Sequence, residues 1–494
     1  MTLLRTVVLV VAATAAAHGY AATYYVRNGG ADANDGLTHD TAWQSLAKVN
    51  ARQFSPGDHV LFLEGNTWAG QLRINASGTA DEPMIVGAYR LENGIPVRGL
   101  RLGRPVIDGT DTVPQQFDGL VRVRGDYVRV ENLSVVNSEG RGIQFENSAY
   151  GVVAACETRN SFKSGIKFIN SDYAVVEDNV VTRAGVAFPE VGGVWGGAIE
   201  LVGSDDGVVR RNEIREVYGE GINANHGSAR AVIEDNRVYA ARAVGIYVDA
   251  APSTTVRRNI VIGTANSEFW RTARSVGAGI AINNEDYHYA VNGGDLPAEV
   301  QSRQAKVYGN LVAGASSGIG IWGQFAESTF DDLLVFNNTL VDNETQLALR
   351  DKPKTGGKLI NNILLSISPD TADTDNTTLA GMTARANYLS RGDPGGGFSD
   401  ALCFHTGLTL TRMSGWRAIN DASAINWQDF AIGAGSAVIG AGDGEPRAMS
   451  QGADTYDVDF NRLPHNAAMD LGALRFSATP VKRPKKPVRV GATP

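Results

Sequence analysis

The 494-residue sequence contains few of the residues that mark several common protein classes. Only two cysteines are present, Cys156 and Cys403, so a disulfide-rich scaffold is excluded, and whether these two pair stays open. The net charge of −8, without a basic excess in the body of the chain, argues against nucleic acid as a partner. Beyond the N-terminal segment no apolar run is long enough to span a membrane. With 43% hydrophobic residues, the chain can still fill a core.

Two terminal segments differ in composition from the rest of the chain. Residues 1–22, MTLLRTVVLVVAATAAAHGYAA, hold one Arg, an apolar run and then small residues, which predicts a secretory signal peptide. A membrane anchor is the alternative, although the apolar run from Thr6 to Ala17 is short for a spanning helix. Residues 477–494 are basic and rich in Pro, which predicts a disordered tail. We therefore expect an exported monomer, periplasmic or extracellular, without a membrane span.

A short repeat organises the middle of the chain. Runs rich in β-branched residues, such as VVEDNVV and VIEDNRV, each contain an Asn, and these are Asn132, Asn179, Asn212, Asn236, Asn259, Asn310, Asn338 and Asn362. Several steps are 23 or 24 residues long, and Cys156 falls near the middle of the 47-residue step from 132 to 179. Each repeat has room for three short strands and none for a helix. This period predicts the coils of a right-handed parallel β-helix.

The repeated Asn residues have a structural explanation in such a solenoid. Strands of successive coils lie about 4.8 Å apart, so equivalent side chains form ladders. An Asn at one turn of every coil can bond to the Asn above and below, and it tolerates the left-handed backbone of a sharp bend. Cys156 would fill the same slot as a small apolar plug. We therefore interpret these Asn residues as structural rather than catalytic.

The sequence resembles the pectin-lyase-like superfamily of secreted β-helix proteins over roughly residues 23–370. The stretches that carry the resemblance are YYVRNGGADANDGLTHDTAWQSLAKVN, PGDHVLFLEG and INASGTADEPMIVGAY, with DFNRLPHNAAMDLGALRF similar to a closing motif. Within the first stretch, TAWQSLAKVNAR predicts a helix that caps the open end of the core. The expected fold is all-β, a right-handed parallel β-helix with an N-terminal cap helix. Its predicted parts are 23–110 (cap and first coils), 111–370 (β-helix with groove-forming insertions) and 371–476 (closing segment).

A Gly-Ile frame recurs along the chain and predicts which side chains face outward. The Ile of each frame must point into the coil, so the next residue and the one two further on point out. These outward residues are Gln144, Glu146, Lys167, Ile169, Glu200, Val202, Asn223, Asn225, Tyr247, Asp249, Ala281, Asn283, Gly320 and Trp322. They form one face of one parallel sheet. Its polar centre includes the stretch EGINANHG, residues 220–227, which we interpret as the middle of a sugar-binding groove.

Three insertions are predicted to flank the same face. They span residues 184–196 and 264–278 and the segment that follows the strand at Gly279. Long loops on a regular scaffold are commonly functional, and aromatic rings beside polar groups suit sugars. The predicted substrate-binding residues are Asn223, Asn225, Tyr247, Trp195, Trp270, Arg271, Arg274, Asn283, Glu285 and Trp322.

The predicted function is cleavage of a uronate-containing, and therefore acidic, polysaccharide by β-elimination. A lyase must neutralise the uronate carboxylate, remove the C5 proton and assist the leaving oxygen. The predicted catalytic residues are Glu200, Asp249, His226, Lys167 and Glu220. Because the β-helix lyases it resembles often use Ca²⁺ held by carboxylate oxygens, the resemblance implies a Ca²⁺ site at Glu200 and Asp249. The specific Trp-Ile-Asp-His and Arg-x-Pro-x-x-Arg patterns of pectate lyases are missing, so no catalytic residue is transferred from that family.

Two other functions remain open at this point. A glycoside hydrolase needs two carboxylates, and Glu200 and Asp249, two coils and about 10 Å apart, would suit inversion. The third possibility is a non-catalytic glycan-binding or surface-adhesion protein. Two candidate residues also have plain structural interpretations, since His226 could close the turn after its strand and Glu220 could accept backbone N–H bonds.

Overall fold

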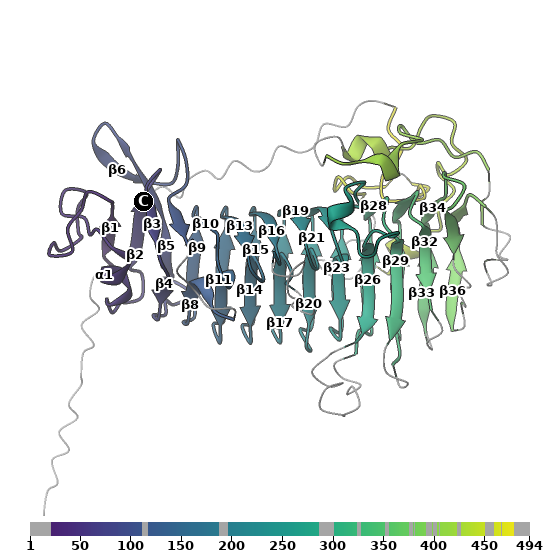
Figure 1. Cartoon of the computed structure of the whole chain (residues 1–494). Helices are drawn as coiled ribbons and strands as arrows, with labels where there is room; N and C mark the ends of the chain where they lie inside the picture. Colours follow the sequence, from purple (N-terminus) through teal and green to yellow (C-terminus); the bar gives the residue numbers. More distant parts are fainter. Residues whose placement is uncertain are drawn as a thin grey trace, which may run out of the picture.

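The chain forms a long parallel β-helix in which every coil contributes strands to three sheets (Figure 1). The computed structural model describes residues 21–478 except 111–116, 187–195, 286–300, 324–327, 351–354, 375–378, 380, 392–397, 399–402, 405, 422–425, 450–458 and 466. The predicted terminal segments, 1–22 and 477–494, therefore lie almost wholly outside the described residues. Three parallel sheets of 14, 12 and 11 described strands, here named A, B and C, confirm the predicted all-β coil.

The strands are short and follow one another around the coil. Sheet A contains β1 (Thr23–Val26), β2 (His59–Leu63), β5 (Met84–Glu92), β9 (Val128–Glu131), β12 (Val152–Ala154), β15 (Val175–Glu177), β18 (Val208–Arg210), β21 (Val232–Glu234), β24 (Thr255–Arg257), β27 (Lys306–Tyr308), β30 (Leu334–Phe336), β33 (Gly357–Ile360) and β36 (Met382–Arg385), with β6 (Ile95–Arg98) antiparallel to β5. Sheet B contains β3 (Thr67–Ala69), β7 (Val106–Asp108), β10 (Ser134–Val136), β13 (Glu157–Ser161), β16 (Val180–Ala184), β19 (Glu213–Val217), β22 (Arg237–Ala241), β25 (Ile260–Ile262), β28 (Leu311–Ala313), β31 (Thr339–Val341), β34 (Ile363–Leu365) and β37 (Tyr388–Leu389). Sheet C contains β4 (Leu72–Ile74), β8 (Gly119–Val123), β11 (Arg141–Glu146), β14 (Ile166–Ile169), β17 (Ile199–Val202), β20 (Ile222–Asn225), β23 (Val244–Asp249), β26 (Ala278–Asn284), β29 (Ser317–Gly323), β32 (Thr345–Leu349) and β35 (Ala372–Thr374).

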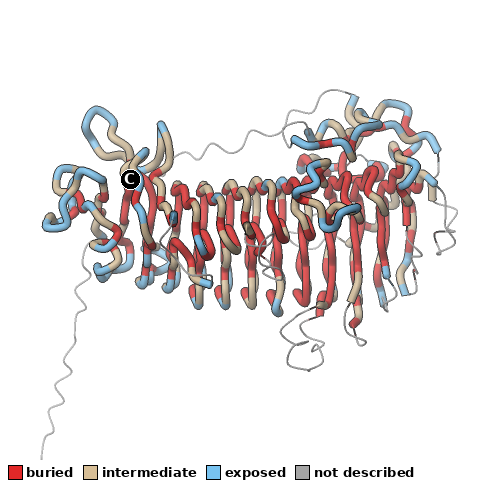
Figure 2. Tube along the Cα trace, viewed as in Figure 1, coloured by how far each residue is buried: buried red, intermediate tan, exposed pale blue. Residues whose placement is uncertain are grey.

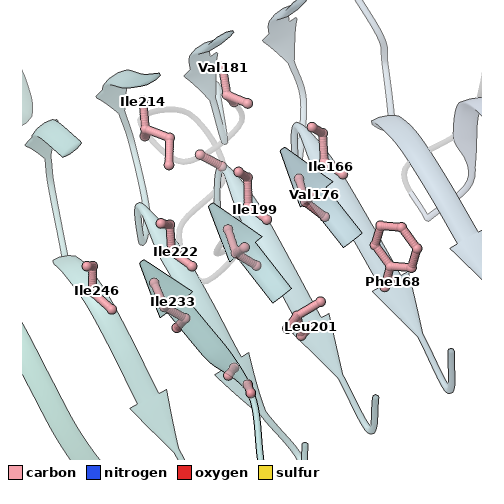
Figure 3. Close-up of a cluster of buried hydrophobic side chains, with 14 of the residues drawn as sticks. Ile166, Phe168, Val176, Val181, Ile199, Leu201, Ile214, Ile222, Ile233 and Ile246 are labelled. Atoms are coloured by element: carbon pink, nitrogen blue, oxygen red, sulfur yellow. The ribbon is translucent and has the colours of Figure 1, made fainter. Parts of the chain in front are cut away.

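The frame isoleucines stack inside the coil and set the register of sheet C. Ile166 pairs with Ile199, which pairs with Ile222, and all three are fully buried (Figure 3). Figure 2 shows that burial follows the strands along the whole solenoid, while the exposed residues gather in loops. Because one face of each strand is apolar, a one-residue slip would expose this row, so the hydrophobic pattern fixes the register.

A buried Asn ladder runs along one corner of the helix, as the repeat predicts. Asn179 Nδ2 donates to Asn212 Oδ1 at 2.9 Å, and the same bond joins each later pair at 3.0 Å. The members are Asn179, Asn212, Asn236, Asn259, Asn310, Asn338, Asn362 and Asn387. These bonds satisfy buried amides that would be costly to leave unpaired.

Two details of the predicted ladder are wrong. Strand register pairs Val130 with Val153 and Val176, so Leu133, Cys156 and Asn179 share the ladder slot and Asn132 stands one residue earlier. Asn132 has a φ of 60°, and Asp178, at the equivalent position, has a φ of 59°. The left-handed residue thus precedes the ladder residue, whose amide is free to bond along the stack.

The N-terminal helix is shorter than predicted. Only α1 (Leu46–Asn50), five residues, is helical, and Ser45 caps it by accepting the Lys48 N–H. Before it, Trp43 forms an isolated bridge with Val26 and donates its backbone N–H to Tyr25 O at 2.9 Å. Leu46 and Val49 of this short helix are buried in the main core. The structure does not show the predicted helix that caps the open end of the core.

The C-terminal segment packs on the outer face of sheet B. From β22 onward the outward residues of this sheet are largely apolar, including Ile260, Ile262 and Leu311, and they form one cluster with Trp416 and Phe430. Figure 1 shows this segment in yellow-green over β28 and β34. Its described helical turns are η3 (Trp416–Ala418), η5 (Trp427–Phe430) and α3 (Glu445–Ala448). A second apolar layer therefore explains a region whose sequence shows no repeat.

Two further expectations concern covalent links and membranes. Cys156 and Cys403 are not joined by a disulfide, and burial raises the pKa of Cys156 to about 12. Among the helices described above, none combines the length and the apolar character that crossing a membrane requires.

Candidate functional site

The outward residues of sheet C align in rows across successive coils, as the Gly-Ile frame predicts. The first row runs through Gln144, Lys167, Glu200, Asn223, Tyr247, Ala281 and Gly320. A second row contains Glu146, Ile169, Val202 and Asn225, and further along Asp249, Asn283 and Trp322. The polar residues of EGINANHG therefore lie between the coils of Glu200 and Tyr247.

Glu200 is a buried carboxylate with three donors. Lys167 Nζ lies 2.7 Å from Oε2, and the Ser164 hydroxyl donates to the same oxygen at 2.6 Å. The Gly197 backbone N–H donates to Oε1 at 2.8 Å. Burial by itself would raise the pKa of Glu200, but the Lys167 charge and these hydrogen bonds outweigh it and lower the pKa to about 2. Glu200 is thus an anion at any physiological pH.

Glu220 has the opposite protonation behaviour. Burial, and then the negative charge of Glu200, raise the pKa of Glu220 to about 7, although Arg271 and Lys167 oppose the shift. The register places Glu220 beside Gly197, whose N–H holds Glu200, so the two carboxyls belong to neighbouring coils. Two carboxyls with pKa values pushed apart can act as an acid and a base. The sequence predicted Glu200 and Asp249 as the two carboxylates of a hydrolase. Asp249, however, lies two coils from Glu200, whereas Glu220 lies one coil from it.

Two side-chain oxygens on the coil of Glu220 have no partner among the described residues. The Oδ1 atoms of Asn223 and Asn225 are buried and accept no hydrogen bond. A buried acceptor without a donor is costly, and it calls for a functional or structural reason. Hydroxyl groups of a sugar are donors that could satisfy both.

A second polar cluster lies further along the same face. Glu285 accepts from the Tyr247 hydroxyl at 2.5 Å and from Trp322 Nε1 at 2.6 Å. Its backbone N–H donates to Asp249 Oδ1 at 2.6 Å, and Trp322 N donates to Asn283 Oδ1 at 3.2 Å. Burial, with the charges of Asp249 and Glu285, raises the pKa of Tyr247 well above its usual value. The structure therefore joins five predicted residues in one network, where Tyr247 keeps its proton.

The structure places only some of the residues predicted from the insertions near the carboxyl pair. The 264–278 insertion starts on the sheet B side, where the 3₁₀-turn η1 (Ser267–Phe269) buries Phe269 in the apolar cluster beneath the C-terminal segment. Trp270 Nε1 donates to Thr264 O at 2.9 Å within the loop itself. Arg271 is close enough to Glu220 to lower its pKa, whereas Arg274 is exposed in a turn. Trp195 lies outside the described residues.

His226 stands apart from the carboxyl pair. It is exposed, and it adopts a φ of 53° in the turn that follows β20. This position in the turn is the one that the turn-closing interpretation requires.

The described residues do not bring Glu200 and Asp249 together as a metal site. The donors described above occupy both oxygens of Glu200, and Asp249 Oδ1 accepts the Glu285 N–H. Over the described ranges, no three His, Cys, Asp or Glu side chains are grouped to hold a metal ion. Since Ca²⁺ takes six to eight oxygen ligands, these residues do not fit it.

One row of residues beside Glu200 was not predicted from the sequence. Arg141, Ser164, Gly197 and Glu220 each stand two residues before a frame Ile or its equivalent, in successive coils. Two of them donate to Glu200, and a third is Glu220 itself. The signal was available in the spacing, but residues at or just before the start of a strand have no predictable direction, unlike those inside a strand.

Known proteins with similar sequence or structure are consistent with this architecture. A family model described as "Right handed beta helix region" matches residues 118–296. A lacto-N-biosidase of Bifidobacterium longum subsp. longum is 42% identical over 81 residues, which cover 15% of this chain and only 5% of that enzyme.

Solved structures are similar over more of the chain. The pectate lyase Pel9A is 17% identical with a TM-score of 0.50, over 92% of this chain and 96% of its own. The GH136 lacto-N-biosidase of Eubacterium ramulus is 15% identical with a TM-score of 0.43, over 74% of this chain and 67% of its own. The three parallel sheets, the family model and the likeness to Pel9A together identify residues 118–296 as a right-handed β-helix region.

Proposed function

We propose that the protein cleaves a polysaccharide on the outer face of sheet C, with Glu200 and Glu220 as the reacting groups. The observation that carries this proposal is the pair of neighbouring carboxyls with pKa values of about 2 and about 7. Perturbed carboxyls that differ in this way are typical of acid–base sites. The similar proteins include a pectate lyase and a lacto-N-biosidase, which supports action on a glycan and leaves the reaction type to the site itself.

The pair is best suited to hydrolysis of a glycosidic bond. Glu220, protonated below pH 7, would donate its proton to the leaving glycosidic oxygen. Glu200, held as an anion by Lys167, would stabilise or attack the sugar carbon, or activate a water molecule. Ser164 and Gly197 fix the Glu200 oxygens, so the carboxylate is oriented before substrate arrives.

The surface next to the pair suits a sugar chain. Tyr247 and Trp322 belong to an apolar cluster on the outer face of sheet C, together with Ala243, Val244 and Ala281. Aromatic side chains of this kind present both apolar area and hydrogen-bonding groups. Asn223 and Asn225 add acceptors for hydroxyl groups between this cluster and Glu200.

Beta-elimination of a uronate polymer is the second candidate, favoured by one observation. The cations Arg141, Lys163 and Lys167 lie on the Glu200 side of the face, and they influence one another electrostatically. Such cations could neutralise a uronate carboxylate. Lys167, however, is paired with Glu200 and therefore is not a free base.

The reaction type can be read from the products of a substrate panel. Alginate, pectate, glucuronan and bacterial exopolysaccharides would be incubated with the purified protein and assayed for reducing ends and for near-ultraviolet absorbance. We expect reducing ends without absorbance, and Glu220→Gln should abolish them while Glu213→Gln on sheet B should not. Absorbing products would establish the lyase, and binding without products would favour a glycan-binding protein.

Three further properties stay predictions. Export, which the composition of residues 1–22 predicts, and a monomeric state are two of them. A Ca²⁺ requirement, implied by the resemblance to lyases, is tested by adding a chelator to the same assay.

A further inference from the structure

We infer that Phe117, Arg141 and Lys163 form a subsite for an anionic sugar residue, on the coils that precede Glu200. The inference adds a substrate class to the proposed function and rests on it for its place in catalysis. Its contacts are separate from the carboxyl pair, because none of the three described residues forms a hydrogen bond or ion pair with Glu200 or Glu220, although the charge of Glu200 acts on Arg141 and Lys163 from a distance.

The three residues converge from successive coils. The Arg141 guanidinium donates from Nη1 to Phe117 O at 2.7 Å and to Gln144 Oε1 at 2.8 Å. Lys163 Nζ lies 3.8 Å from the centroid of the Phe117 ring. Lys163 immediately precedes Ser164, which donates to Glu200, so the cluster adjoins the carboxyl pair along the sheet.

Arg141 is a buried cation with no carboxylate in ion-pair contact among the described residues. Arg141 is 8% exposed, and the two acceptors of its Nη1 are neutral. Its Nε is buried without a partner in the described part of the chain. The carboxylates of Glu200, Asp118 and Glu146 act on Arg141 only from a distance, and Asp118 itself accepts from Arg122 and Gln71. A buried charge is normally paired, so a cation that lacks a contacting carboxylate beside an exposed aromatic ring points to an anion that binds there.

Buried charges on sheet A of this molecule are paired, which makes the lack of a contacting carboxylate at Arg141 unusual. On sheet A, Glu177 is paired with Arg210 and Arg211, and Glu234 with Arg257 and Arg258. The solenoid therefore supplies a carboxylate where it needs to stabilise an outward guanidinium. Arg141 and Lys163 have no such carboxylate within ion-pair distance among the described residues.

The Phe117 ring supplies the rest of a sugar subsite. It is 61% exposed, although a large apolar side chain gains nothing from exposure unless a ligand covers it. A sugar ring stacked on it would bring an equatorial or exocyclic anion to Lys163 and Arg141. A carboxylate or a sulfate would serve equally, and the two cations would accept either.

The test compares binding of charged and uncharged forms of the same glycan. Calorimetry would measure the affinity of alginate and pectate oligomers, of the same oligomers with carboxylates reduced to alcohols, and of dextran sulfate. The variants are Lys163→Gln, Arg141→Gln and Phe117→Ala, with Arg215→Gln, an exposed arginine on sheet B, as the matched charge control. Thermal unfolding of each variant would confirm that it folds.

We expect Lys163→Gln and Arg141→Gln each to weaken binding of an acidic oligomer about ten-fold, the usual loss for one charged hydrogen bond. Binding of reduced oligomers should not change, Arg215→Gln should match the wild type, and Phe117→Ala should weaken both oligomers. Dextran sulfate binding that depends on Lys163 would identify sulfate as an accepted anion, and its absence would restrict the subsite to carboxylates. Equal affinity of the wild type for charged and reduced oligomers would overturn the inference. Because binding needs no turnover, an inactive protein that passes this test would refute only the proposed catalysis.

Discussion

The ammonium of Lys167 and the carboxylate of Glu200 face each other across two neighbouring coils, with Nζ 2.7 Å from Oε2. The Glu200 side chain is 7% exposed and that of Lys167 17%, so water screens the pair only weakly. The ion pair holds Glu200 as an anion, and that negative charge in turn favours a proton on Glu220. The chemistry proposed for the site therefore depends on this contact.

Replacing Lys167 with Met should destabilise the protein. The change leaves a buried carboxylate without its counter-ion, and we expect the free energy of unfolding at pH 7 to fall by about 3 kcal/mol. Urea denaturation would measure it. The double variant Lys167→Met/Glu200→Gln should recover most of the loss, since it removes the stranded charge as well. Wild-type stability in the single variant would mean that the pair is solvated.

Replacing Glu220 with Gln should remove activity and leave the fold intact. Loss of a proton donor typically costs 10²–10⁴-fold in rate, so we expect at least a hundred-fold fall in kcat on the best glycan of the panel, with little change in KM. Glu213→Gln, the matched exposed carboxylate on sheet B, should keep wild-type kinetics. A Glu220→Gln enzyme with normal kcat would exclude Glu220 as the acid.

Stability should depend on pH through both carboxyls, with opposite signs. The pKa of Glu220 is raised to about 7, so its contribution is fully present below about pH 4.5 and is lost as pH rises through 7. The pKa of Glu200 is lowered to about 2, so its contribution is present above about pH 4.5 and is lost as pH falls toward 2. Thermal midpoints between pH 4.5 and 8 should decline with pH, and Glu220→Gln should flatten that decline. An unchanged slope in the variant would argue against the shift.

Removing one rung of the Asn ladder should weaken the scaffold without altering the site. Asn236→Ala leaves the partners of a buried amide unsatisfied, and we expect a loss of about 1–3 kcal/mol in unfolding free energy. Asn28→Ala, at an exposed position, should cost less than about 0.5 kcal/mol. Glycan affinity should match the wild type in both variants. An unchanged unfolding free energy in Asn236→Ala would show that water replaces the missing amide.

Most of the fold was predictable because strand periodicity and the Asn spacing both repeat. The ladder was misaligned at Asn132 because Leu133 and Cys156 interrupt the Asn pattern, and only strand register reveals the true slot. The C-terminal segment could not be placed, since apolar residues such as Trp416 pack on sheet B without any period of their own.

The candidate site was predictable in position but only partly in composition. Alternation within strands located Lys167, Glu200 and Asn223 on one face, because direction in a strand is fixed. Ser164 precedes β14 and Arg141 is the first residue of β11, and both were missed because direction at such a corner depends on the turn.

The ladder also shows how freely this scaffold can be lengthened. Asn236 and Asn259 are 23 residues apart and bond at 3.0 Å, and Asn259 and Asn310 are 51 apart and bond at the same distance. A coil more than twice the usual length thus returns to the same register. Loops beside the site can therefore be exchanged between relatives, or designed afresh, as independent modules whose insertion leaves the frame of the solenoid unchanged.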